Sequence, residues 1–226
     1  MKKCVASMCL CLMASFAGAD VLDYKWGNVS LNHIAYTDNS QSEDFSYVEI
    51  EGGFGSGDIH FYGFYDFNDN DSTFYKINPT FLFTNSMFVN YTQKGFKDTD
   101  ADLGVTDQYF GIGNKFSVLD GFISTSVNLR KTDNEFVDKE GNNGIAVLTA
   151  LSIPVNQRVA VDGWFDYSLF QRRKFGSEDT DFRGNIGVRY THTNGLFARV
   201  AYAWVQADDV MRDVDSGVHF SFGYYL

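Results

Sequence analysis

Apolar and polar residues alternate with a period of two along most of this chain, and turn-forming residues separate the alternating stretches. In one stretch, Ile59, Phe61 and Phe67 alternate with His60 and Asp66. Such alternation predicts β-strands whose two faces meet different surroundings. Twelve strands are expected near 24–37, 44–55, 58–67, 73–84, 87–96, 104–117, 121–131, 144–154, 158–171, 181–193, 196–207 and 215–226.

The connections between these strands alternate in length. Short ones fall at 55–57, 85–86, 119–121, 155–157 and 193–195, and longer polar ones at 38–43, 68–72, 97–103, 132–143, 172–180 and 208–214. Outer-membrane barrels have short periplasmic turns and longer outside loops. The chain is therefore expected to be all-β, a transmembrane antiparallel β-barrel of twelve strands in an up-and-down meander. Both termini should lie in the periplasm, with lipid and lipopolysaccharide around the barrel.

Residues 1–19 have the pattern of a secretory signal peptide, which leaves 20–226 for the barrel. Lys2 and Lys3 precede an apolar run, and the three cysteines (Cys4, Cys9 and Cys11) fall inside this segment. Loss of the two lysines takes the formal net charge from -11 to -13. A chain this acidic is not expected to bind nucleic acid. The last strand ends on an apolar face, which resembles the signal read by the barrel assembly machinery.

A soluble β-sandwich is the competing fold. Only two prolines occur, and aromatic residues make up 17% of the chain. Many of these aromatics stand near strand ends on the apolar face, where a membrane interface favours them. This placement favours the barrel.

The polar face of each strand should line the lumen, and that face carries both charge signs together with aromatic rings. The candidate substrate-binding residues on it are Tyr47, Glu49, Glu51, Tyr62, Phe64, Asp66, Lys76, Trp164, Asp166 and Arg189. Charges inside a narrow barrel also pair simply to satisfy one another. The aromatic rings suggest a solute with a flat ring and hydroxyl groups, such as a nucleoside, whose base stacks on them.

The same residues resemble the nucleoside-specific channel family of outer-membrane porins (Tsx-like, OmpK). The likeness runs through 23–26, 47–51, 61–66, 76–79, 111–113, 143–154 and 163–167, in that order. It implies a monomeric twelve-stranded barrel with a narrow lumen that passes nucleosides. It also implies that Glu49, Glu51, Tyr62, Phe64, Asp66 and Lys76 are lumen residues of matching type, and that outer loops can serve as phage receptors.

Three alternatives stay open at this point. They are a small porin for acidic oligosaccharides, a general diffusion pore, and a barrel that also acts as a phage or surface receptor. No catalytic, metal-ligating or cofactor-binding motif is recognised, so the chain is not expected to be an enzyme or to need a cofactor. In particular, the parity of His33 allows it to face lipid, but no catalytic serine constellation is evident around it.

Overall fold

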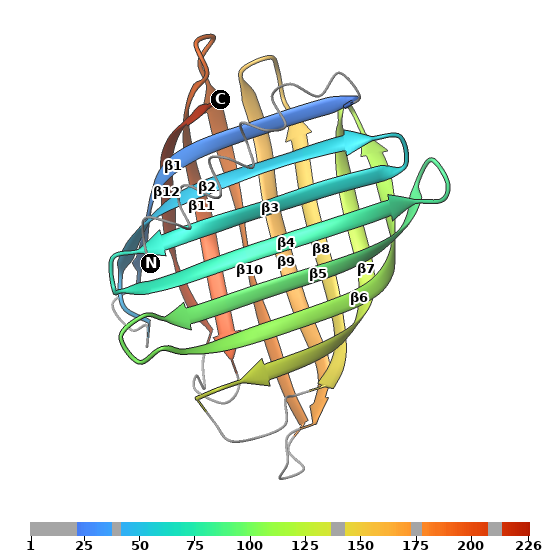
Figure 1. Cartoon of the computed structure of the whole chain (residues 1–226). Helices are drawn as coiled ribbons and strands as arrows, with labels where there is room; N and C mark the ends of the chain where they lie inside the picture. Colours follow the sequence, from blue (N-terminus) through green and yellow to red (C-terminus); the bar gives the residue numbers. More distant parts are fainter. Residues whose placement is uncertain (1–21, 38–41, 137–142, 173–177, 208–213) are drawn as a thin grey trace.

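The computed structural model describes residues 22–37, 42–136, 143–172, 178–207 and 214–226. Within these ranges twelve antiparallel strands form one closed barrel, as the alternation predicts. Figure 1 shows β1–β5 on the front wall and β8–β12 behind them. The strands are β1 (Tyr24–Tyr36), β2 (Phe45–Ser56), β3 (Ile59–Asn68), β4 (Ser72–Leu82), β5 (Met87–Asp98), β6 (Leu103–Val118), β7 (Gly121–Asn134), β8 (Asn143–Pro154), β9 (Val159–Arg172), β10 (Glu178–Thr191), β11 (Leu196–Ala207) and β12 (Asp215–Tyr225). The predicted signal peptide, residues 1–19, lies outside the described residues.

Each strand pairs with its neighbours in sequence, and β1 pairs with β12 to close the barrel. The closing register places Asn28, near the start of β1, beside Tyr225, the last residue of β12. The first strand therefore begins at the end of the barrel where the last strand finishes. The alternative of a two-sheet sandwich is therefore wrong. No helix capable of crossing a membrane occurs in the described residues.

The two ends of the barrel differ in their connections. We call the end with the turns around Gly57, Ser86, Leu119, Asn156 and Asn194 the short-connection end, and the opposite end the long-connection end. Gly57 adopts a φ of 56°, a left-handed conformation that glycine reaches without strain, which allows the tight turn from β2 to β3. The start of β1 and the end of β12 lie at the short-connection end.

Side chains alternate between the inside and the outside of the wall. In β12, His219 and Ser221 are buried, whereas Phe220 and Phe222 are exposed at 47% and 56%. The same alternation leaves an outer wall of exposed aliphatic and aromatic side chains, including Leu31, Phe110, Val127, Leu129 and Val200. A continuous apolar surface of this extent is unfavourable in water and is typical of a barrel surrounded by lipid.

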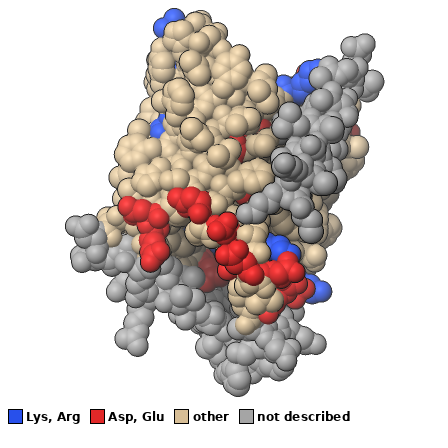
Figure 2. Space-filling view, turned by 60° about the vertical axis from the view of Figure 1, so that its left-hand side comes forward, with Lys and Arg blue, Asp and Glu red and all other residues tan. Residues whose placement is uncertain are grey.

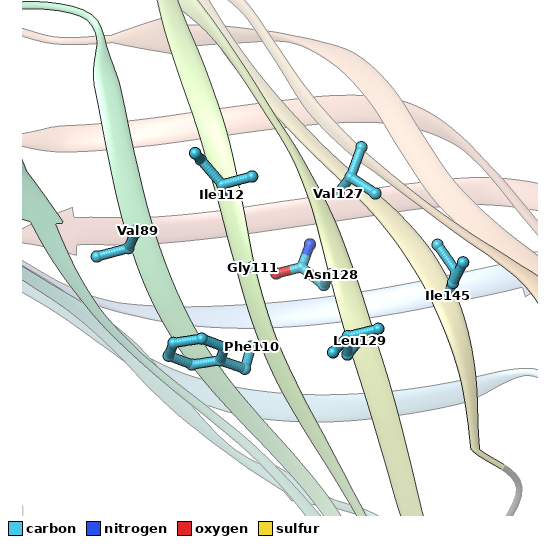
Figure 3. Close-up of a pocket in the computed structure, with 8 residues that line it drawn as sticks. All are labelled: Val89, Phe110, Gly111, Ile112, Val127, Asn128, Leu129 and Ile145. Carbon is cyan, nitrogen blue, oxygen red and sulfur yellow. The ribbon is translucent and has the colours of Figure 1, made fainter.

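One shallow hollow on the outer wall, of about 290 Å³, lies over Gly111 between β5 and β8 (Figure 3). Its rim is formed by apolar residues that point outward, so it belongs to the lipid-facing wall and not to the lumen: Val89, Phe110, Ile112, Val127, Leu129 and Ile145.

Substitution of Gly111 by alanine is expected to destabilise the barrel by about 1–3 kcal/mol, the usual cost of overpacking. A Cβ atom there would lie 2.3 Å from the Val127 carbonyl oxygen and 2.2 Å from Asn128 Oδ1. The backbone oxygen belongs to a paired strand and has little freedom to move. Denaturant unfolding of the barrel in lipid vesicles measures the change. Gly57→Asn is the control, because that position faces open space and asparagine tolerates its φ; equal stabilities of Gly111→Ala and the unsubstituted chain would contradict the argument.

Candidate functional site in the barrel lumen

Contacts across the barrel establish which side chains face the lumen. Lys94 of β5 forms an ion pair with Asp166 of β9, although three strands separate them along the wall. Asn90 of β5 donates to Asn128 of β7 at 3.0 Å. Such contacts arise only between side chains on the inner face. By register with these residues and by their own contacts, the ten predicted site residues all lie on the inner face: Tyr47, Glu49, Glu51, Tyr62, Phe64, Asp66, Lys76, Trp164, Asp166 and Arg189. That they bind a solute stays a prediction.

One part of the inner wall, on β2 and β3, is acidic. Glu49 and Asp66 stand directly opposite each other in the β2–β3 register, and Glu51 lies two residues along from Glu49. Glu51 accepts hydrogen bonds from Asn28 Nδ2 at 2.8 Å and from the Tyr62 hydroxyl at 2.7 Å. No lysine or arginine lies within 4 Å of these three carboxylates in the described part of the chain. The hydrogen bonds that this acidic wall receives thus come from neutral donors.

A series of aromatic rings runs along the same side of the lumen. It begins near the short-connection end, where Trp26 stacks on Tyr62 at a centroid distance of 6.1 Å. Tyr62 meets Phe64 edge-on at 6.2 Å, and Phe64 contacts Phe74 at 5.7 Å. Because β1, β3 and β4 each contribute rings of the same inward parity, the contacts form one continuous path, which we call the aromatic path.

At one level of the lumen the charge changes sign across a single aromatic residue. Strand pairing places Glu51 beside Phe64, Phe64 beside Lys76 and Lys76 beside Lys94. The Lys76 ammonium lies 5.5 Å from the centre of the Tyr62 ring and has no acidic partner within 4 Å among the described residues. A solute ring against Phe64 would therefore have an acceptor group on one side and a cation on the other.

The Lys94–Asp166 ion pair crosses the lumen. Both side chains are almost fully buried, at 6% and 11% exposure. The Lys94 ammonium also lies 5.1 Å from the Tyr109 ring centre and 6.0 Å from that of Trp164. Trp164 itself is 38% exposed although it faces inward, so it borders open space inside the barrel. The ion pair thus narrows the lumen next to an accessible aromatic face.

Arg130 organises a second set of contacts nearer the long-connection end. Its guanidinium donates to both oxygens of Asp107, to the Ser168 hydroxyl at 2.7 Å and to Asp181 at 3.3 Å. Thr132 donates to Asp107 at 2.5 Å. These contacts join β6, β7, β9 and β10 across the inner surface. The pairing of opposite charges expected for a narrow barrel is present here.

A third set lies on the β9–β11 side. Asp162 is paired with both Arg199 and Arg189, the latter at 3.3 Å. Arg199 also donates to Asn185 at 2.6 Å, and Arg189 donates to the Tyr225 hydroxyl. Arg189, one of the predicted site residues, is therefore occupied by protein partners.

Several inward residues escaped the sequence analysis. The polar face of the strand at 87–96 was not assigned, although Asn90, Thr92 and Lys94 recur at every second position and are all buried. The same parity rule that found Lys76 identifies them. Asn28 follows it too. The parity of the last strand already places His219 inward, and its Nε2 lies 3.0 Å from the Tyr47 hydroxyl.

His33 has a serine neighbour that the sequence analysis did not identify. The β1–β2 register brings Ser46 opposite His33, and the Ser46 hydroxyl lies 3.1 Å from His33 Nδ1 on the outer side of the wall. The nearby Asp69 carboxylate accepts from the Ser46 backbone N–H at 3.0 Å. Among the residues that the structure describes, neither Asp69 nor another acid contacts the imidazole as an orienting third group.

The outer surface carries most of its exposed acidic side chains at one end. Figure 2 shows acidic side chains in a band along the edge of the largely uncharged wall. Exposed acids gather at the long-connection end: Glu43, Asp44, Asp69, Asp71, Asp100, Asp102, Asp133 and Glu135. Within the described residues, no grouping of three His, Cys, Asp or Glu side chains is arranged to hold a metal ion.

No protein-family model matches the chain, and no curated protein sequence does either. Solved structures do resemble it. The KdgM porin in complex with disordered oligogalacturonate has a TM-score of 0.53 at 8% identity, over 87% of this chain and 98% of that one. The loop L8 deletion mutant of OmpT, an outer membrane protein of Vibrio cholerae, has a TM-score of 0.50 at 11% identity, over 92% and 100%. At such identities the likeness establishes the fold: the chain has the closed antiparallel barrel of outer-membrane proteins.

Proposed function

We propose that this chain is an outer-membrane channel for the passive uptake of small solutes, and that nucleosides are the solutes its lumen fits best. The main observation behind this proposal is that Glu51, Phe64 and Lys76 lie side by side at one level of the lumen. A nucleobase on the Phe64 ring would gain stacking energy. Its sugar hydroxyls would donate to Glu51, and its carbonyl or ring nitrogen atoms would accept from Lys76. The sequence resemblance to the Tsx-like family supports the same proposal.

The apolar outer wall supports placement in a membrane, and the unequal connections support an orientation. In this orientation the short-connection end, with both termini, faces the periplasm, and the acidic long-connection end faces outward. The outward end is also where a phage would bind if the chain serves as a receptor. We expect no catalysis from the barrel, because no catalytic motif is recognised in the sequence.

A porin for acidic oligosaccharides is the second candidate. Lys76 and Arg183 both face the lumen, and neither forms an ion pair within 4 Å in the described part of the chain. Free cations of this kind would attract an anionic sugar, and one structural neighbour is described as a porin in complex with oligogalacturonate. The acidic wall of Glu49, Glu51 and Asp66 opposes this candidate, because it would repel the same solute.

Phe64→Ala is expected to weaken reversible block of the channel by adenosine about tenfold, since base–aromatic stacking contributes ~1–3 kcal/mol. Single-channel recording in planar bilayers measures the block. Phe110→Ala is the matched control, because Phe110 is 63% exposed on the outer wall and should leave the block unchanged. Stronger block by trigalacturonate than by adenosine would favour the second candidate. Equal passage of all small solutes would indicate a general diffusion pore.

A further inference from the structure

We infer that Asn28, Glu49, Glu51 and Asp66 form a binding subsite for an organic cation inside the lumen, which we call the acceptor patch. It would take the ammonium group of a solute that carries an aromatic ring. The inference rests on the proposed channel, because the solute must reach the lumen. It does not require that nucleosides be the solute.

The first support is the charge of the patch. Glu49 and Asp66 are cross-strand partners, and two carboxylates directly opposite each other on neighbouring strands destabilise a sheet. Each of the three other inner clusters joins its acids to a lysine or arginine, as Arg130 does with Asp107. The acceptor patch has no such base within 4 Å among the residues described. A cation held between the carboxylates would offset their repulsion.

The second support is independent of charge and comes from hydrogen bonding. Asn28 is 2% exposed, and its amide faces the patch, since its Nδ2 donates to Glu51. The Oδ1 atom of the same amide is buried and has no donor among the described residues. Asp66 Oδ1 is likewise buried and has no hydrogen-bond partner among the described residues, and Glu49 accepts a long hydrogen bond of 3.5 Å from the Ser30 hydroxyl. Buried acceptors without donors are costly, so the patch fits a ligand that supplies several N–H groups.

The surroundings of the patch define the class of ligand. Within the described residues, these carboxylates do not belong to any group of three or more His, Cys, Asp or Glu side chains that could hold a metal ion. The Tyr62 hydroxyl bonds Glu51 at 2.7 Å, which fixes the aromatic path beside the acids. Aromatic faces attract cations, and an ammonium group offers three N–H donors. A ring-bearing primary amine meets both requirements.

Three probes with one ring and different charges provide the test: benzylammonium, benzyl alcohol and benzoate. Each is added to the full chain in planar bilayers, and the concentration for half-block of the single-channel current is measured. We expect benzylammonium to block at about tenfold lower concentration than benzyl alcohol, because hydrogen bonds to charged groups are the stronger ones. Benzoate should block least. Block by benzoate at the same or a lower concentration than benzylammonium would overturn the inference.

The variants Glu49→Gln and Asp66→Asn test whether benzylammonium blocks the channel by binding at the acceptor patch. Each keeps the shape of its side chain and removes one charge, so each should raise the half-blocking concentration of benzylammonium about tenfold and leave that of benzyl alcohol unchanged. Asp100→Asn is the control, since Asp100 is an exposed acid in the β5–β6 connection and should change neither. If one variant does not insert, the other carries the same test. Unchanged benzylammonium block in the variants would show that the carboxylates share a proton or hold water, and would overturn the inference.

The outcomes separate this inference from the proposed function. Block by benzylammonium without block by adenosine would support the acceptor patch and contradict nucleoside selectivity. Block by adenosine without any charge preference among the three probes would support nucleosides and contradict the patch. Absence of any conductance would contradict both.

Discussion

Replacing Lys94 and Asp166 together by alanine is expected to raise the single-channel conductance by a factor on the order of two, because pore width controls passage. The two side chains meet across the lumen between β5 and β9 and are almost fully buried there. Removing both takes away the obstruction without leaving one charge unpaired, whereas either single substitution would leave a buried ion alone. Single-channel recording at fixed salt concentration measures the change.

The control for this experiment is the double alanine variant at Lys97 and Asp102. These residues also form an ion pair, at 2.5 Å, but they are 50% and 84% exposed at the long-connection end. Their loss should leave the conductance as it was. If the Lys94/Asp166 double variant conducts no better than this control, the ion pair does not constrict the pathway.

Arg130→Met is expected to lower the free energy of unfolding by about 3–5 kcal/mol, the usual cost of removing one partner from a buried ion pair. The guanidinium joins Asp107, Ser168 and Asp181, and its loss leaves the buried Asp107 carboxylate without its bidentate partner. Methionine keeps the length and apolar volume of the side chain, so the change reports mainly on the charge. Denaturant unfolding in lipid vesicles gives the value.

Lys97→Met provides the comparison for Arg130→Met. It removes the same charge from an ion pair that is exposed to solvent, where the expected loss is at most about 1 kcal/mol. A loss of the same size for the two variants would mean that the lumen around Arg130 is as well hydrated as the outer rim, and that the cluster is not structural.

The strands and the face of each side chain could be predicted because both depend on local alternation. Whether a residue such as Phe64 faces inward follows from its position in the alternation of its strand, and this changes only where the register slips. The closed barrel followed from the alternating connection lengths. The inward direction of Glu51, Lys76 and Trp164 needed no further information, and the structure places all three on the lumen side.

The partners of the lumen residues could not be predicted in the same way. The Lys94–Asp166 contact depends on how closely β5 approaches β9 across the barrel, and no sequence pattern encodes that distance. The His33–Ser46 contact depends on the register between β1 and β2, which the length of their connection leaves undetermined. Sequence alone therefore described the lumen as mixed in charge, whereas the structure divides it into paired clusters and one acidic wall.

The most direct test of the channel is solute uptake by liposomes that contain the purified full chain. The account predicts that such liposomes admit adenosine, and that adenosine enters faster than a sugar of matched size. Liposomes that contain the folded barrel and yet admit adenosine no faster than protein-free liposomes would contradict it.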